Sequence, residues 1–137
     1  ITGVLNITTP YKQKVNQIRL DYTYNPAVYD YVLKIVNLID EEWDIRLKAY
    51  DQTNIDRLTN CTITFYNGES STQVSIIDGI YAQQTGDWYS LLPYDTVYLN
   101  VTVRADSVST SRVYLYLEIL IPDTSIVTRF IITIEIT

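Results

Sequence analysis

Three asparagines in this chain are candidates for covalent modification. Asn6, Asn60 and Asn100 each stand two residues before a threonine, which is the Asn-X-Thr pattern that N-glycosylation requires. Such glycans are attached at exposed positions of secreted proteins. The sequence therefore predicts N-glycans as covalent partners of the chain and an extracellular or cell-surface location.

Catalytic chemistry has few candidates. The chain has no histidine and one cysteine, and its four glycines are isolated, so nucleophilic triads, zinc sites and phosphate-binding loops lack their usual residues. Four carboxylates, Asp40, Glu41, Glu42 and Asp44, could serve glycoside hydrolysis or bind Ca²⁺. Their spacing does not match an EF-hand loop, and a solvated acidic turn explains them better. We expect no catalytic residue, metal site or cofactor, and no enzymatic activity.

The single cysteine and the aromatic residues could serve either core packing or binding. Cys61 alternates with outward polar residues, which favours a small buried hydrophobic group over an intermolecular disulfide. Trp43 also alternates inward, whereas Trp88 remains a candidate for a sugar-binding platform. The thirteen tyrosines favour cross-strand packing on half-exposed sheet faces, with a lateral contact surface as the alternative.

The elements that must position these residues are strands. In residues 96–104, Val97, Leu99, Val101 and Val103 share one face and Asn100 lies on the other, which is the alternation of a half-buried strand. Residues 1–9 and 60–66 alternate in the same way. All three sequon asparagines are therefore predicted to face outward.

Turn signals recur about every ten residues, as expected for an all-β protein with short strands. Asn67-Gly68 is the strongest hairpin signal, Asp78-Gly79 is a second turn, and residues 54–58 fit one helical turn. Residues 27–39 fit a strand buried on both faces, although periodicity alone also allows a helix. Nine to ten short strands in one domain predict a β-sandwich or a jelly roll.

Composition narrows the function further. With 137 residues, 47% hydrophobic and 19% charged, the chain can bury a core and is not disordered. A net charge of −6 without a basic patch argues against nucleic-acid binding. No apolar run approaches the roughly 20 residues of a membrane-spanning helix. The first residue is not Met, which suggests a removed signal peptide, with a trimmed chain as the alternative.

Four segments carry a family resemblance. They are W-x-I-x-L at 43–47, NCTITFYNG at 60–68, STQVSIIDG at 71–79 and the run from Gly86 to Val103 that contains LLPYDTVYLNVTV. Across residues 40–137 the chain resembles the secreted β-sandwich subunits of archaeal surface filaments of the thread and bundling-pilus type. The resemblance implies a structural subunit of a glycosylated extracellular filament that serves adhesion or biofilm contact.

The resemblance also implies how subunits join, which is by donor-strand complementation into a head-to-tail homopolymer. A terminal strand of one subunit pairs with the open sheet edge of the next, and a contact that does not close forms a filament. Residues 1–17 would then be donor strand and linker, and residues 18–137 the sandwich domain. The donor residues expected to face the core are Ile1, Gly3, Leu5 and Ile7.

Two further alternatives stay open on the sequence. The C-terminal strand, with Phe130, Ile132, Ile134 and Ile136 on one face, is predicted to fold back beside residues 97–103 or 113–121. Otherwise this strand, and not residues 1–9, would be the donor. An Ig-like binding or surface-layer module and a viral jelly-roll capsid or spike protein are the other functional hypotheses.

Overall fold

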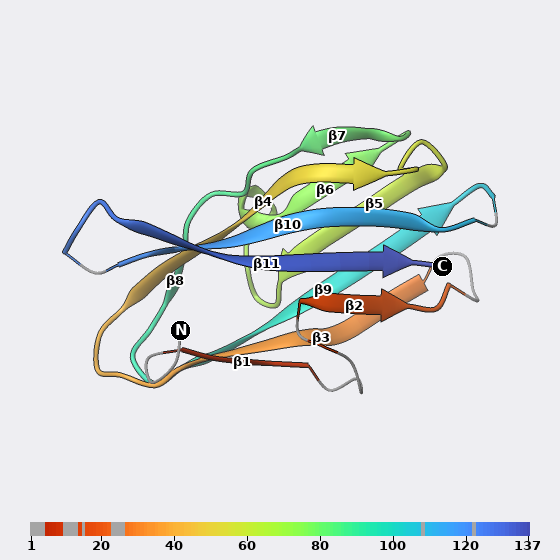
Figure 1. Ribbon diagram of the computed structural model, residues 1–137. Helices are drawn as coiled ribbons and strands as arrows, with labels where there is room; N and C mark the ends of the chain where they lie inside the picture. Colours follow the sequence, from red (N-terminus) through yellow and green to blue (C-terminus); the bar gives the residue numbers. More distant parts are fainter. Residues whose placement is uncertain (1–4, 10–13, 15, 23–26, 108, 122) are drawn as a thin grey trace.

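The computed structural model describes residues 5–9, 14, 16–22, 27–107, 109–121 and 123–137. Within them, eleven strands and one short 3-10 turn, η1 (Ser70–Thr72), form two packed sheets (Figure 1). The described part of the chain contains no α-helix, and therefore no helix long and apolar enough to span a membrane. The predicted all-β sandwich is confirmed, with one strand more than the upper expectation.

The strands divide into a six-stranded and a five-stranded sheet. The six-stranded sheet has the order β1 (Leu5–Thr8), β3 (Ala27–Asn37), β9 (Thr96–Ala105), β5 (Leu58–Phe65), β6 (Val74–Ile77) and β7 (Ile80–Gln83). The five-stranded sheet has the order β2 (Gln17–Leu20), β11 (Val127–Ile136), β10 (Ser111–Leu120), β4 (Trp43–Thr53) and β8 (Tyr89–Leu91). The chain crosses repeatedly between the two sheets.

Alternating residues of both sheets fill the space between them, because each strand turns one face inward. The inward residues predicted for β9 are all buried, and so are Trp43 and Cys61. Burial raises the pKa of the Cys61 thiol to about 12, so the side chain is a protonated, inert group at neutral pH. Its predicted role as a small buried hydrophobic residue is confirmed.

The C-terminal strand folds back as predicted. β11 pairs with β10 along its whole length, from Ser111 opposite Ile136 to Leu120 opposite Val127. Ile132, Ile134 and Ile136 have no exposed surface, and Phe130 packs partly buried against the same core. β11 is therefore an integral strand of its own subunit.

β3 is a strand, but it is not buried on both faces as expected. Its register with β9 shifts between Tyr29 and Leu33, because β3 carries two extra residues there. After this bulge both Val32 and Leu33 point into the core, whereas Val28 is 62% exposed. The bulge breaks the two-residue period, which explains why the sequence also allowed a helix.

The turns differ from expectation at two places. The tight two-residue hairpin lies at Asp78-Gly79 between β6 and β7, with φ of 52° and 77°. Asn67-Gly68 instead begins a longer connection that contains η1. The predicted helical turn at 54–58 is an irregular turn closed by a hydrogen bond from the amide of Leu58 to the carbonyl of Ile55.

Candidate assembly site

The two N-terminal strands lie at the same side of the sandwich. β1 is the edge strand of the six-stranded sheet and is antiparallel to β3, while β2 is the edge strand of the five-stranded sheet and is parallel to β11 (Figure 1). Each has only four residues. One side of the sandwich is therefore completed by two short edge strands, β1 and β2, which belong to an N-terminal arm, residues 5–20.

The opposite side is closed by a tightly packed crossing between β7 and β8. Here the amide of Ala49 donates to the carbonyl of Gln84, and that of Gly86 donates to the carbonyl of Leu47, both at 2.9 Å. A Cβ at Gly86 would lie 2.3 Å from the carbonyl oxygen of Thr72, so no larger residue fits. The β7–β8 side is thus closed by a tight crossing of the chain, whereas the other side ends in two four-residue edge strands.

β1 contains Leu5 and Ile7, the two predicted donor residues that the structure describes. Leu5 is 3% exposed and Ile7 packs partly buried against the core, so both face inward as expected for a strand that completes a sandwich. Ile1 and Gly3 lie outside the described residues. In the single chain β1 pairs with its own β3, and its donation to another subunit stays a prediction.

β2 contributes two residues to the core. Ile18 and Leu20 are 1% and 2% exposed, and the strand pairs with Thr133 to Ile136 of β11. Parallel partners distant in sequence leave no local turn signal, so this pairing had no sequence signature. β2 begins at Gln17, and the division into a linker that ends at residue 17 and a domain that begins at residue 18 stays a prediction.

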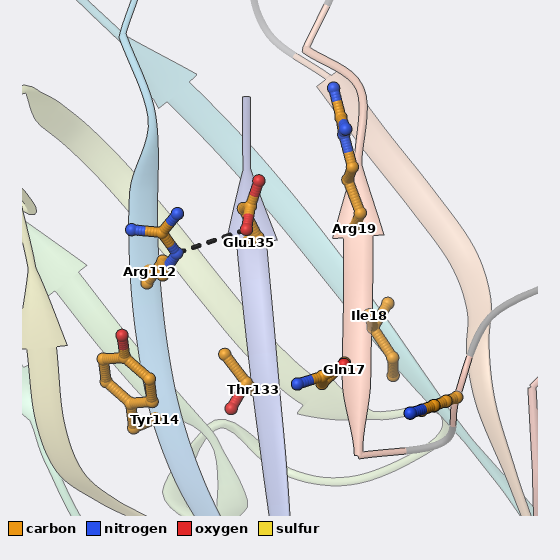
Figure 2. Close-up of a pocket in the computed structure, with 8 residues that line it drawn as sticks. Gln17, Ile18, Arg19, Arg112, Tyr114, Thr133 and Glu135 are labelled. Carbon is orange, nitrogen blue, oxygen red and sulfur yellow. Dashed lines mark hydrogen bonds and ion pairs between the residues drawn. The ribbon is translucent and has the colours of Figure 1, made fainter.

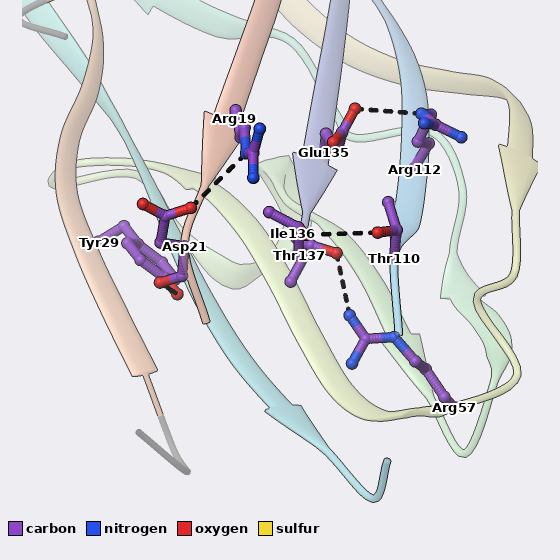
Figure 3. Close-up of polar contacts among 9 residues, drawn as sticks. All are labelled: Arg19, Asp21, Tyr29, Arg57, Thr110, Arg112, Glu135, Ile136 and Thr137. Atoms are coloured by element: carbon purple, nitrogen blue, oxygen red, sulfur yellow. Dashed lines mark hydrogen bonds and ion pairs between the residues drawn. The ribbon is translucent and has the colours of Figure 1, made fainter. Parts of the chain in front are cut away.

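A buried arginine fixes the chain where the arm ends. Arg57 donates from Nε to Ser111 Oγ at 2.7 Å. It also donates from Nη2 to the carbonyl of Ile136 at 3.0 Å (Figure 3). Tyr22 follows β2, donates its amide to the carbonyl of Thr137 at 2.7 Å, and lies with its ring centre 6.0 Å from the guanidinium carbon of Arg57. These contacts anchor the C-terminal end of the arm, whereas β1 is held by its four-residue pairing with β3 and, just beyond it, by a hydrogen bond of 3.0 Å from Thr9 Oγ1 to the carbonyl of Val32.

All three sequon asparagines belong to the six-stranded sheet. The residues next to them in sequence, such as Leu5, Cys61 and Val101, point into the core, so the asparagines lie on the outer face of the sheet. Asn6 is exposed, and Asn60 and Asn100 are half-buried. Asn100 Oδ1 accepts a hydrogen bond of 2.9 Å from the amide of Tyr31 in the β3 bulge. The outward orientation is confirmed, whereas glycosylation itself stays a prediction.

The outer face of the five-stranded sheet is lined by aromatic and charged side chains. Tyr50 stacks on Tyr116 with ring centroids 4.1 Å apart, which is the cross-strand packing expected for the tyrosines. The guanidinium carbon of Arg46 lies 4.3 Å above the ring of Trp88, so this ring is not a free sugar platform. A shallow groove of about 660 Å³ crosses β2, β11 and β10, and the Arg112–Glu135 ion pair lies in it (Figure 2).

A buried carboxylate organises the same face. Glu118 is 1% exposed and accepts hydrogen bonds from Nε of Arg46 at 2.8 Å and from Nε of Arg129 at 2.9 Å. Burial by itself raises the pKa of Glu118, but the hydrogen bonds and charges of the two arginines outweigh it and hold the pKa below its usual value. The network ties β4, β10 and β11 together.

Replacing Glu118 with Gln should reduce stability in a pH-dependent way. A carboxyl group whose pKa is lowered on folding stabilises the protein above its unfolded pKa, and that contribution is lost as pH falls through the folded pKa. Urea titrations at neutral pH should show Glu118→Gln less stable by about 1–3 kcal/mol, and the difference should vanish in acid. The control Glu135→Gln, at a more exposed pair, should change stability by under about 1 kcal/mol. A pH-independent difference for Glu118→Gln would contradict this account.

The acidic cluster of the sequence lies at the β3–β4 connection. Asp40, Glu41 and Glu42 are exposed and Asp44 is half-buried at the start of β4. Among the described residues, no group of three or more carboxylates or thiols is placed to hold a metal ion. The backbone carbonyl of Glu41 accepts a hydrogen bond from the buried Asn37 side chain at 2.7 Å, which gives this turn a structural role.

Comparisons with known proteins establish the fold. No protein-family model and no curated protein matches the chain. Among solved structures, the chain is similar to the PapD-like domain 7 of human CEP192, with 8% identity, a TM-score of 0.59, and coverage of 98% of this chain and 84% of that one. It is also similar to the CooA pilin subunit from enterotoxigenic Escherichia coli, with 9% identity, a TM-score of 0.51 and coverage of 98% and 97%. The chain thus has the β-sandwich fold found in PapD-like domains and pilins.

Proposed function

We propose that this protein is a structural subunit of an extracellular, glycosylated filament in which β1 is exchanged between subunits. The role is structural and adhesive, without enzymatic activity. The observation that carries the proposal is β1 itself, a four-residue edge strand that fills the core beside β3 with Leu5 and Ile7. The position that it occupies on its own chain is the one that a neighbour's donor strand would take.

The connection to the rest of the chain allows such an exchange. Residues 9–16 separate β1 from β2, and eight extended residues can span up to roughly 26 Å. Tyr22 and Arg57 fix the chain beyond β2, so β1 can leave without detaching the whole arm. The pilin among the fold neighbours supports the proposal by analogy only.

A second candidate is an Ig-like binding or surface-layer module that keeps its own strand. The pairing of β1 with β3 within one chain favours it. The two functions differ in whether the purified protein polymerises. Negative-stain electron microscopy of the concentrated full-length chain should show filaments, and a uniform population of single domains at all concentrations would favour the module.

Glycosylation is a separate prediction. Native material should carry N-glycans at Asn6, Asn60 and Asn100, because their neighbours place all three on the outer face of one sheet. Intact mass before and after enzymatic deglycosylation, with peptide mapping, measures the occupancy. Unmodified peptides covering all three sites would refute the prediction. Asn6 should be the least occupied, because donation of β1 to a neighbour reduces the space around it.

A further inference from the structure

The β3 bulge holds a tyrosine in a conformation that side chains rarely adopt. Tyr31 has φ of 58°, a left-handed geometry that is strained for a residue other than glycine. The bulge is held in place by Asn100 on the neighbouring strand, because its Oδ1 accepts a hydrogen bond from the amide of Tyr31. Strain of this kind concentrates at binding sites, because the displaced side chain is part of the function.

The bulge presents the Tyr31 ring on the outer face of the six-stranded sheet. The ring is 46% exposed and meets Tyr98 of β9 edge-to-face, with centroids 4.6 Å apart. Tyr66, which follows β5, lies 6.0 Å away in a similar arrangement. Two strands, β3 and β9, and the turn after β5 therefore contribute to one aromatic surface that is half-open to solvent and lies outside the core.

A cavity of about 310 Å³ lies beside this aromatic surface. Tyr31 and Tyr98 form its aromatic wall, and Thr8, Thr9 and Lys34 complete it. Hydroxyl groups and one ammonium group therefore stand next to aromatic rings. Among the described residues, Lys34 has no carboxylate within ion-pair distance, so its charge remains available to a ligand.

We propose that this cavity binds a carboxylated saccharide. Sugar rings present apolar C–H faces that pack on aromatic rings, and their hydroxyl groups match those of Thr8 and the tyrosines. The Thr9 hydroxyl already donates to the carbonyl of Val32 at 3.0 Å. A carboxylate on the sugar would pair with Lys34. This pair would make the site prefer acidic over neutral sugars, although the chain as a whole has a net charge of −6. The chemistry of the lining thus points to a uronic acid or a similar acidic sugar.

The site does not depend on the filament proposal. Thr8 and Thr9 come from the end of β1 and its extension, whereas the aromatic rings and Lys34 come from β3 and β9. If β1 is exchanged, the same cavity forms with the threonines of a neighbouring subunit. Binding by the monomer and binding by an assembled filament would therefore both use this lining.

The test uses full-length protein produced without glycosylation. Trigalacturonate, a hyaluronan tetrasaccharide and sialyllactose are titrated calorimetrically, with neutral galactotriose as the reference sugar. At least one acidic saccharide should bind with a dissociation constant at or below about 1 mM, and about tenfold or more tighter than galactotriose. Failure of all three acidic saccharides to bind, or equal binding of the neutral sugar, would overturn the proposal.

Two substitutions locate the binding. Tyr31→Gly removes the ring but suits the positive φ, so it should weaken binding by about tenfold or more while the melting temperature stays equal or rises. Lys34→Gln should abolish the preference for the acidic sugar. Tyr94→Gly is the matched control, because Tyr94 is also exposed with φ of 58° but does not line the cavity. Loss of binding in Tyr94→Gly, or unchanged binding in Tyr31→Gly, would contradict the assignment.

Discussion

Ile134→Asp should abolish the cooperative unfolding transition of this protein. Ile134 is fully buried near the C-terminal end of β11, with Val113 and Ile18 as its register partners on the two neighbouring strands. Loss of the buried side chain costs about 2–5 kcal/mol, and an unpaired buried carboxylate costs more. Their sum is comparable to the whole stability of a domain, which is about 5–15 kcal/mol. Circular dichroism during a thermal scan measures the effect.

Ile131→Asp provides the control on the same strand. Its side chain is 50% exposed and lies outside the core, so stability should change by under about 1 kcal/mol. A stable folded Ile134→Asp monomer that only fails to assemble would contradict the account. Such a result would mean that β11, not β1, is the donated strand.

Deletion of residues 1–9 should abolish polymerisation and leave a folded but weakened monomer. The deletion removes Leu5 and Ile7 from the core. Burial contributes roughly 1.5–3 kcal/mol for the buried Leu5 and less for the partly buried Ile7. The remaining sheets keep their long central pairings, such as β10 with β11 and β3 with β9. Urea denaturation measures the loss of stability, and electron microscopy measures the loss of filaments. Normal filaments from the truncated chain would refute the donor assignment.

A peptide of residues 1–9 supplied in trans separates strand loss from general damage. Added to the truncated chain, it should restore the melting temperature, because it can pair with the open edge of β3. A peptide with Leu5→Asp and Ile7→Asp is the matched control and should have no effect. If both peptides restored the melting temperature equally, the rescue would not come from the core-filling side chains of β1.

The sequence predicted those parts of the fold that local patterns encode. Strict alternation located β9 and β11 and the inward orientation of Cys61, because a half-buried strand requires it. It failed at β3, where the amide of Tyr31 in the bulge donates a hydrogen bond to Asn100, a residue far away in the sequence. A local pattern carries no information on such a partner.

Of the features at the candidate sites, some follow from local sequence patterns and others depend on which strands become neighbours. The outward placement of the sequon asparagines follows from period two alone. The parallel pairing of β2 with β11, the buried Arg57 and the cavity beside Tyr31 each join segments far apart in the sequence. These features arise from topology, and single-sequence patterns do not determine which strands become neighbours.

Strand exchange can be detected directly with two single-cysteine chains. Asn6 of β1 lies opposite Val36 of β3, and directly opposed residues on one sheet face are close enough for a disulfide after small adjustments. One chain carries Asn6→Cys, a second chain of different mass carries Val36→Cys, and both carry Cys61→Ala to remove the native thiol. The two are mixed unfolded, refolded, concentrated and oxidised. We expect a disulfide-linked heterodimer of the two chains on a non-reducing gel. Absence of this heterodimer, while a double Asn6→Cys and Val36→Cys chain forms only an internal disulfide, would show that β1 stays on its own subunit.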